Sequence, residues 1–196
     1  MLHLFFSFLL SLIPYSSFNS EEEYIIYLQQ TLQSPGIDEV TKVRAEFLLE
    51  GALKNRPGSP AADFSFTDRN GKTSSLYREI EALPVPCLLI FYDPDCNHCN
   101  EVIEEIIQNA EIDSLVSNDL LKIIAVYSGD EFSLWQKSSL RLPGKWCVGY
   151  EDGSLQDDER YLIIESPSIY LLRPDKTVWI KEMKDIKELK NLWKEF

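Results

Sequence analysis

The sequence is poor in basic residues and in histidine. Its 196 residues include two histidines, and 19 lysines and arginines stand against 32 aspartates and glutamates, so the formal net charge is -13. Nucleic acids and anionic membranes are polyanions, and such a chain would be repelled by both. We therefore expect no nucleic-acid partner, and we interpret the acidic runs as solvated helix starts.

Long hydrophobic runs are also scarce. Residues 1–20 contain no Asp, Glu, Lys or Arg, but their apolar stretch is about a dozen residues long, against the roughly twenty that cross a bilayer. The pattern is typical of a secretory signal segment, although the usual basic start is missing. It predicts export to the periplasm or cell envelope, with peripheral membrane association through this segment if it is retained.

Cysteine is scarce as well, with four residues that are too few and too scattered for a disulfide scaffold. Two of them, Cys96 and Cys99, follow an apolar run over residues 87–92 that predicts a buried strand. The segment from Asp95 onward predicts a helix, with Asp95 as a candidate N-cap. At a helix start the unsatisfied N–H groups and the helix dipole favour a thiolate over a thiol. The stretch therefore predicts a reactive cysteine.

Helical periodicity separates the two thiols of this pair. Apolar residues at positions 99, 102, 103, 106 and 107 share one helix face, and polar residues share the other. We therefore expect Cys96 to be exposed at the helix start and Cys99 to face the core. Cys87 is interpreted as a small buried hydrophobic residue. For Cys147 three alternatives stay open: a packed strand residue, a resolving thiol, or a disulfide partner of Cys87.

The rest of the chain predicts an α/β architecture. Two amphipathic helices are expected over residues 21–33 and 38–54. The second carries one apolar stripe, formed by Val40, Val43, Phe47, Leu48 and Leu49. A β-hairpin with an Asn-Gly turn follows over residues 62–76. Further strands are predicted at residues 121–127, 146–150, 169–172 and 177–180, and further helices at 77–83, 131–140, 157–164 and 185–196.

This order of elements resembles the thioredoxin fold, a central mixed β-sheet flanked by helices. More closely, the sequence is similar to the TlpA/ResA-like branch of secreted bacterial thiol-disulfide oxidoreductases, and residues 61–72, 91–99 and 166–172 carry the likeness. The resemblance covers about residues 57–196. It implies a thioredoxin-like domain with an N-terminal β-hairpin, preceded by a signal-like segment over residues 1–20 and a helical extension over residues 21–56.

The resemblance also implies roles for individual residues. Cys96 would be the attacking thiol and Cys99 the resolving thiol, with Pro167 a cis-proline that follows Ser166 and faces them across the site. The implied partners are protein thiols and disulfides together with an upstream redox partner. The implied redox group is the Cys96–Cys99 disulfide itself, with no further cofactor and no metal.

The sequence departs from the family pattern in two places. Asn97 and His98 stand between the cysteines, and a histidine there is expected to stabilise the Cys96 thiolate and to make the disulfide more oxidising. The buried acid that relatives use as a proton carrier is missing, because its two usual positions hold Ile90 and Val102. Glu101 is a candidate proton carrier, and a solvated surface glutamate is the alternative.

Other functions compete with disulfide exchange. A structural zinc site needs four ligands, whereas Cys96, His98 and Cys99 supply three and the other histidine, His3, lies in the signal-like segment. A binding or scaffold protein with a fixed Cys96–Cys99 disulfide is the main alternative, and a peroxidase fits less well. Whether the pair would act as reductant, oxidant or isomerase does not follow from the sequence.

Overall fold

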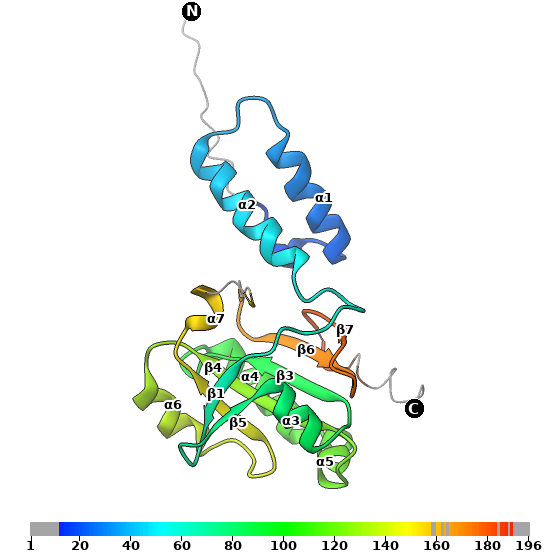
Figure 1. Ribbon diagram of the computed structural model, residues 1–196, viewed down its shortest axis with the longest axis vertical. Coiled ribbons are helices and arrows are strands. Elements are labelled where there is room, and N and C mark those ends of the chain that lie inside the picture. The colour runs from blue at the N-terminus through cyan, green and yellow to red at the C-terminus, as the bar shows by residue number, and fades with distance from the viewer. Residues whose placement is uncertain are drawn as a thin grey trace, which may run out of the picture. The chain divides into compact units, whose positions relative to one another are not determined.

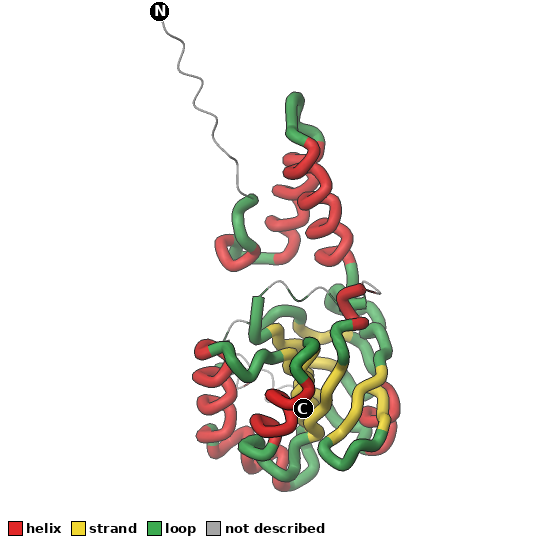
Figure 2. The backbone as a smooth tube through the Cα atoms, turned by 90° about the vertical axis from the view of Figure 1, so that its left-hand side faces the viewer, coloured by secondary structure: helices red, strands yellow, loops and turns green. Residues whose placement is uncertain are grey.

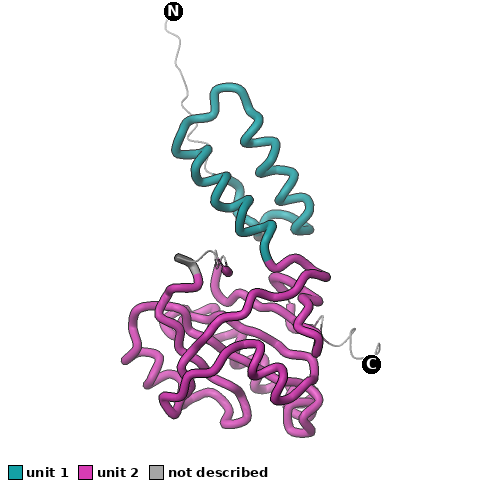
Figure 3. The backbone as a smooth tube through the Cα atoms, viewed as in Figure 1, with its two compact units in different colours: residues 1–54 teal, residues 55–196 magenta. Residues whose placement is uncertain are grey.

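The computed structural model describes residues 12–157, 160–161, 163, 165–183, 185–187 and 189. Contacts between Cα atoms divide the chain into two compact units, Met1–Lys54 and Asn55–Phe196 (Figure 3). Each unit is described by itself below. Most of the signal-like segment, residues 1–11, lies outside the described residues.

Unit 1 is a helical hairpin (Figure 1). After a short 3-10 helix, Tyr15–Ser17, it consists of α1, Glu21–Leu32, and α2, Glu39–Leu53. Ser20 caps α1 by accepting a hydrogen bond from the Glu23 N–H, and Asp38 caps α2 through the Thr41 N–H at 2.9 Å. Side-chain oxygens at both N-caps therefore satisfy N–H groups that the helices leave open.

The face of α2 that packs differs from the predicted one. Its buried residues are Ala45, Leu48 and Ala52, and Val40, Val43 and Phe47 are exposed. The predicted stripe is therefore wrong at Val40, Val43 and Phe47, whereas its member Leu48 is buried. The buried positions follow the same i, i+3, i+7 spacing around a different face, where two alanines allow a neighbouring helix to approach closely.

Unit 2 is built on a seven-stranded mixed sheet with the order β2-β1-β5-β4-β3-β6-β7. β3, β4 and β5 run parallel to one another, and β6 pairs with β3 in the antiparallel direction. The predicted α/β class and the predicted β-hairpin, formed by β1 and β2, are confirmed. The strands are β1 Ser65–Asp68, β2 Thr73–Ser75, β3 Cys87–Phe91, β4 Lys122–Ser128, β5 Cys147–Glu151, β6 Ser168–Leu172 and β7 Val178–Ile180.

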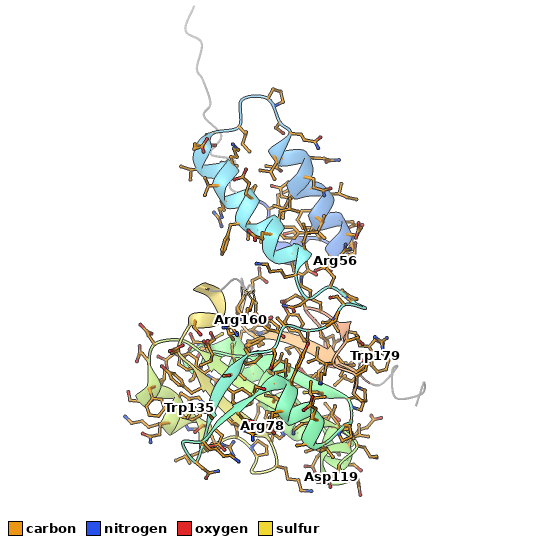
Figure 4. All side chains as sticks on the ribbon, in the orientation of Figure 1. Arg56, Arg78, Asp119, Trp135, Arg160 and Trp179 are labelled. Atoms are coloured by element: carbon orange, nitrogen blue, oxygen red, sulfur yellow. The ribbon has the colours of Figure 1, made fainter. Side chains whose placement is uncertain are left out.

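Helices lie on both faces of this sheet (Figure 2). One core cluster packs α4, α5 and α6 on the face that includes Ile90 and Ala125, and the other packs α3 on the face that includes Leu89 and Ile124. Trp135 on α6 and Trp179 on β7 mark two separate flanks of the unit (Figure 4). The helices are α3 Leu76–Ala82, α4 Asn97–Gln108, α5 Ala110–Ser117, α6 Phe132–Ser139 and α7 Ser154–Asp157.

Two helices, α5 and α7, have bounds that the predictions did not give. α5 is a separate helix because Asn109 ends α4 and its side chain accepts from the Glu111 and Ile112 N–H groups. α7 covers Ser154–Asp157, where the Glu151 carboxylate accepts from the Leu155 N–H, and half of the turn expected at residues 157–164 lies outside the described residues. Most of the closing helix predicted at residues 185–196 lies outside the described residues.

The topology brings several strand ends to one edge of the sheet. β3, β4 and β5 all end there, and β6 begins there, because Phe91 pairs with Val126 on one side and with Ser168 on the other. Side chains just beyond these ends are therefore brought together. Within the described part of the chain, no helix combines the length and apolar character that a membrane crossing requires.

Candidate active site

Cys96 occupies the N-cap position of α4, immediately after β3 and its connecting turn. Its half-buried Sγ accepts a hydrogen bond from the Cys99 N–H at 3.2 Å. The candidate cap Asp95 is therefore wrong by one residue. Asp95 instead donates its N–H to the Asp93 carboxylate at 2.9 Å, and Cys96 donates its N–H to the Asp93 carbonyl at 3.1 Å. This turn aims the sulfur at the open end of the helix, where N–H donors stabilise negative charge on sulfur.

Cys99 lies on the inward face of the same helix and is fully buried. Burial raises the pKa of its thiol to about 12, and the neighbouring Cys96 raises it further. The two thiols therefore differ as the helical periodicity predicts: one is accessible at the helix start, and the other is held protonated against the core.

Pro167 and Ser166 approach the thiols from a distant part of the sequence. The Ser166–Pro167 peptide bond is cis, and the Ser166 carbonyl oxygen lies 3.7 Å from the Cys96 Sγ. Both residues precede β6, whose first residue, Ser168, pairs with Phe91 at the end of β3. The antiparallel pairing of β6 with β3 therefore places this segment beside Cys96.

Asn97, His98 and Glu101 lie on the solvent side of α4. The side chains of His98 and Glu101 are 70% and 80% exposed, and the His98 Nδ1 lies 3.9 Å from the Glu101 Oε2. Glu101 is thus a solvated residue on the polar helix face, away from the face that buries Cys99. The structure does not bring it to the position of a buried proton carrier.

A half-buried carboxylate that sequence reasoning missed lies at this edge of the sheet. Glu182 follows β7, and its Oε1 accepts a hydrogen bond from the Ser168 hydroxyl at 2.7 Å. Burial raises the pKa of Glu182 to about 7. The local sequence, Lys181-Glu182-Met183, carries no motif that distinguishes this acid from a surface residue. Its position depends on the pairing of β7 with β6.

Cys87 and Cys147 lie on the sheet face that packs α3. Burial raises the pKa of both thiols, that of Cys147 to about 12. β4 separates β3 from β5, so these cysteines are about 9–10 Å apart across two strand spacings, beyond the roughly 7 Å that a disulfide spans. Of the three alternatives, a Cys87–Cys147 disulfide is therefore excluded, and Cys147 is a packed strand residue.

Metal ligands do not gather at the site. Among the residues that the structure describes, no group of three or more His, Cys, Asp or Glu side chains is arranged to hold an ion.

No protein-family model and no curated protein matches the sequence. Among solved structures, a thioredoxin-like protein from Bacteroides caccae is 31% identical with a TM-score of 0.80, over 90% of this chain and 63% of its own. The C-terminal domain of an uncharacterized Bacteroides fragilis protein is 27% identical with a TM-score of 0.65, over 71% of this chain and 97% of its own.

A third structure, the thioredoxin domain of a thiol-disulfide oxidoreductase from Bacteroides vulgatus, is 19% identical with a TM-score of 0.60, over 71% of this chain and 97% of its own. The fold and the paired thiols at the start of α4 define a thioredoxin-fold protein. The chain is similar to the thioredoxin-like protein from Bacteroides caccae over most of its own length. It spans less than two thirds of the length of the Bacteroides caccae protein.

Proposed function

We propose that this protein is a thiol-disulfide oxidoreductase that exchanges disulfides with protein substrates through Cys96 and Cys99. The observation that carries the proposal is the asymmetry of the pair. Cys96 Sγ is accessible and accepts the Cys99 N–H at 3.2 Å, while Cys99 is fully buried one helical turn further on. Attack on a disulfide needs an accessible thiolate, and release needs a second thiol that waits nearby.

Exchange would proceed in two displacements. The Cys96 thiolate attacks one sulfur of a substrate disulfide, which forms a mixed disulfide and expels the other substrate sulfur as a thiolate. Cys99 then loses its proton and attacks the Cys96 Sγ, which forms the Cys96–Cys99 disulfide and releases the second substrate sulfur. The substrate gains two electrons and two protons, and the reverse sequence oxidises a dithiol.

The protein's own residues would support these steps in different ways. The Ser166–Pro167 segment presents backbone beside Cys96, with its carbonyl 3.7 Å from the sulfur, and so positions a substrate strand there. Asn97 and His98 fill the gap between the cysteines at the exposed helix start, where His98 tunes the thiolate. An upstream redox partner would restore the starting state of the pair after each cycle.

We place this activity in the periplasm or cell envelope. The support is the uncharged, apolar stretch at residues 1–20, which is typical of export signals. In such compartments disulfides persist, and their exchange between proteins is a continuing requirement.

Two cysteine variants test the proposal. With a disulfide-bonded peptide as substrate, Cys96→Ser should lose at least about a thousandfold in exchange rate, because the attacking thiolate is gone. Cys99→Ser should instead accumulate a mixed disulfide between Cys96 and the peptide, visible by mass spectrometry under non-reducing conditions. Cys147→Ser, a substitution of a packed thiol outside the site, is the matched control and should exchange normally.

Two results would contradict this function. Turnover that survives Cys96→Ser would remove the assigned nucleophile. A Cys96–Cys99 reduction potential below about -300 mV would mark a structural disulfide, which favours the scaffold alternative.

A further inference from the structure

The Glu182 side chain, just after β7, lies against Ser168, the first residue of β6. The Met183 N–H donates to the Ile169 carbonyl at 2.9 Å, which leaves Glu182 beside Ser168. The Ser168 side chain is fully buried, and its hydroxyl donates to the Glu182 Oε1 at 2.7 Å. Tyr170, two residues along the same strand, also lowers the pKa of this carboxylate. The Ser168 hydroxyl thus bonds the acid from the start of β6.

The hydrogen bond between Ser168 and Glu182 lies one residue from the Ser166–Pro167 segment, which faces Cys96. Ser168 follows Pro167 directly, and the Ser166 carbonyl lies 3.7 Å from the Cys96 Sγ. The backbone of Ser168 is meanwhile paired with Phe91 on β3. The segment is therefore held at Ser168 by backbone on one side and by the Glu182 carboxylate on the other.

The backbone of Glu182 shows that its position is determined by its contacts. Its φ is +54°, in the left-handed region that residues with a Cβ rarely adopt. The Ser168 hydrogen bond and the Met183 backbone bond that follows accompany this conformation.

We propose that Glu182 is a positioning residue for disulfide exchange, whose ionised carboxylate holds Ser168 and thereby keeps the Ser166–Pro167 segment in place beside Cys96. The inference rests on the proposed function, because the position of this segment matters only to a substrate that docks there. Glu182 itself makes no contact with the reacting sulfurs in this assignment. It acts through Ser168.

The position of the Ser166–Pro167 segment beside Cys96 should depend on pH. The pKa of Glu182 is raised to about 7, mainly by burial and in smaller part by Glu165, while Ser168, Lys181 and Tyr170 oppose the shift. The carboxylate therefore loses its charge near neutral pH, and hydroxyl donors bond an ionised carboxylate more strongly than a neutral acid. Exchange with a peptide should rise as pH increases through about 7 by an amount that the Cys96 thiol alone does not explain.

Glu182→Gln separates the two contributions, because it keeps the shape and removes the titration. The experiment measures exchange with a disulfide-bonded peptide and alkylation of Cys96 by iodoacetamide, both from about pH 5.5 to about pH 8.5. At the upper end, exchange should fall about 3- to 10-fold, the effect of losing one such hydrogen bond, and the inflection near pH 7 should vanish. Alkylation, which needs no substrate strand, should stay within about twofold.

Two further variants complete the design. Ser168→Ala removes the donor and keeps the acid, so it should reproduce the loss of exchange even if Glu182→Gln folds poorly. Glu104→Gln makes the same acid-to-amide change at an exposed position of α4, and it should keep the wild-type profile.

The outcomes are distinguishable. A Glu182→Gln profile that keeps the inflection, or an equal fall in exchange and alkylation, would overturn the positioning role while leaving disulfide exchange intact. A wild-type protein that exchanges no peptide disulfide at any pH would overturn the proposed function itself, and the positioning role with it.

Discussion

Two regions of unit 2 each combine a pair of cysteines with a half-buried carboxylate, and they differ in where they lie on the sheet. At the edge where β3 ends, Cys96 and Cys99 lie on α4 and Glu182 lies nearby beside Ser168. On the sheet face beneath α3, Cys87 and Cys147 lie within strands, with Glu79 close by. The edge offers a helix start with unpaired N–H groups, which the strand interior lacks. Position relative to the strand ends therefore distinguishes a reactive thiol from an inert one.

The two carboxylates differ as much as the thiols do. Burial favours the neutral form of both, but Glu79 accepts hydrogen bonds from Lys122 at 2.8 Å and Ser74 at 2.6 Å, and these lower its pKa overall. Glu182 is bonded by hydroxyls, with burial dominant, and its pKa rises to about 7. A cation in contact thus reverses the effect of burial. The sheet edge therefore carries an acid, Glu182, with a pKa near neutrality, and the sheet face beneath α3 carries the Lys122–Glu79 ion pair.

The largest effect should appear in thiol labelling. A pKa of about 12 for Cys99 and Cys147 leaves about one molecule in ten thousand ionised at pH 8, so native alkylation should occur at Cys96. Cys96→Ser should slow labelling at least about a hundredfold, measured by mass spectrometry of iodoacetamide adducts. In urea, the remaining three cysteines of this variant should all react. Fast labelling of Cys147 in the native protein would contradict the expected difference between the thiol at the sheet edge and the thiols on the sheet face.

Glu182→Gln should change how stability depends on pH. Because the folded-state pKa is raised from 4.5 to about 7, the folded wild type binds a proton more tightly than the unfolded chain does. Its free energy of unfolding should therefore fall relative to the variant as pH rises from about 4.5 to about 7, by roughly 3 kcal/mol. Urea denaturation of both proteins at several pH values measures the difference. A constant difference would show that Glu182 is not buried as described.

Lys122→Met tests the ion pair between Lys122 and Glu79, next to the sheet face beneath α3. The side chains of Lys122 and Glu79 are 13% and 24% exposed, and removing the lysine leaves the carboxylate without its cation. We expect a loss of roughly 1–3 kcal/mol in the free energy of unfolding at neutral pH. The loss should shrink at acidic pH, once the pH falls below the lowered folded-state pKa of Glu79 and the carboxyl is protonated in both states.

The double variant Lys122→Met/Glu79→Gln supplies the control for this pair. It removes both charges, and it should recover part of the lost stability. If the single and double variants were equally unstable, the loss would come from the packing of the lysine chain and not from an unpaired carboxylate.

Local patterns predicted those parts of the fold and site that local sequence controls. An apolar run followed by two cysteines indicated β3 and α4, and helical spacing indicated that Cys99 is buried. The resemblance implied a cis bond before Pro167, and that bond is cis. The cap was misassigned to Asp95 because a shift of one residue in a helix start leaves the periodicity unchanged.

Features that depend on pairing between distant segments were not predictable in this way. Glu182 reaches Ser168 only because β7 folds back along β6, and its own neighbours in sequence, Lys181 and Met183, form no motif. In α2 the apolar residues surround much of the helix, so periodicity allowed two faces and the close packing at Ala45 and Ala52 decided between them. In each case a tertiary contact selected among locally equivalent arrangements.

The smallest effect should come from replacing His98, which follows Cys96 by two residues at the start of α4. The histidine side chain is 70% exposed and lies 3.9 Å from the Glu101 carboxylate, so water screens much of its influence on the Cys96 thiolate. His98→Ala should lower the reduction potential of the Cys96–Cys99 pair by about 10–30 mV, because the reduced form loses a weak stabilising charge. Equilibration with glutathione buffers measures this shift, and Glu101→Gln should move the potential slightly upward. A decrease well beyond this range for His98→Ala would show that His98 contacts the sulfur directly, and the helix start would then share its role with the histidine.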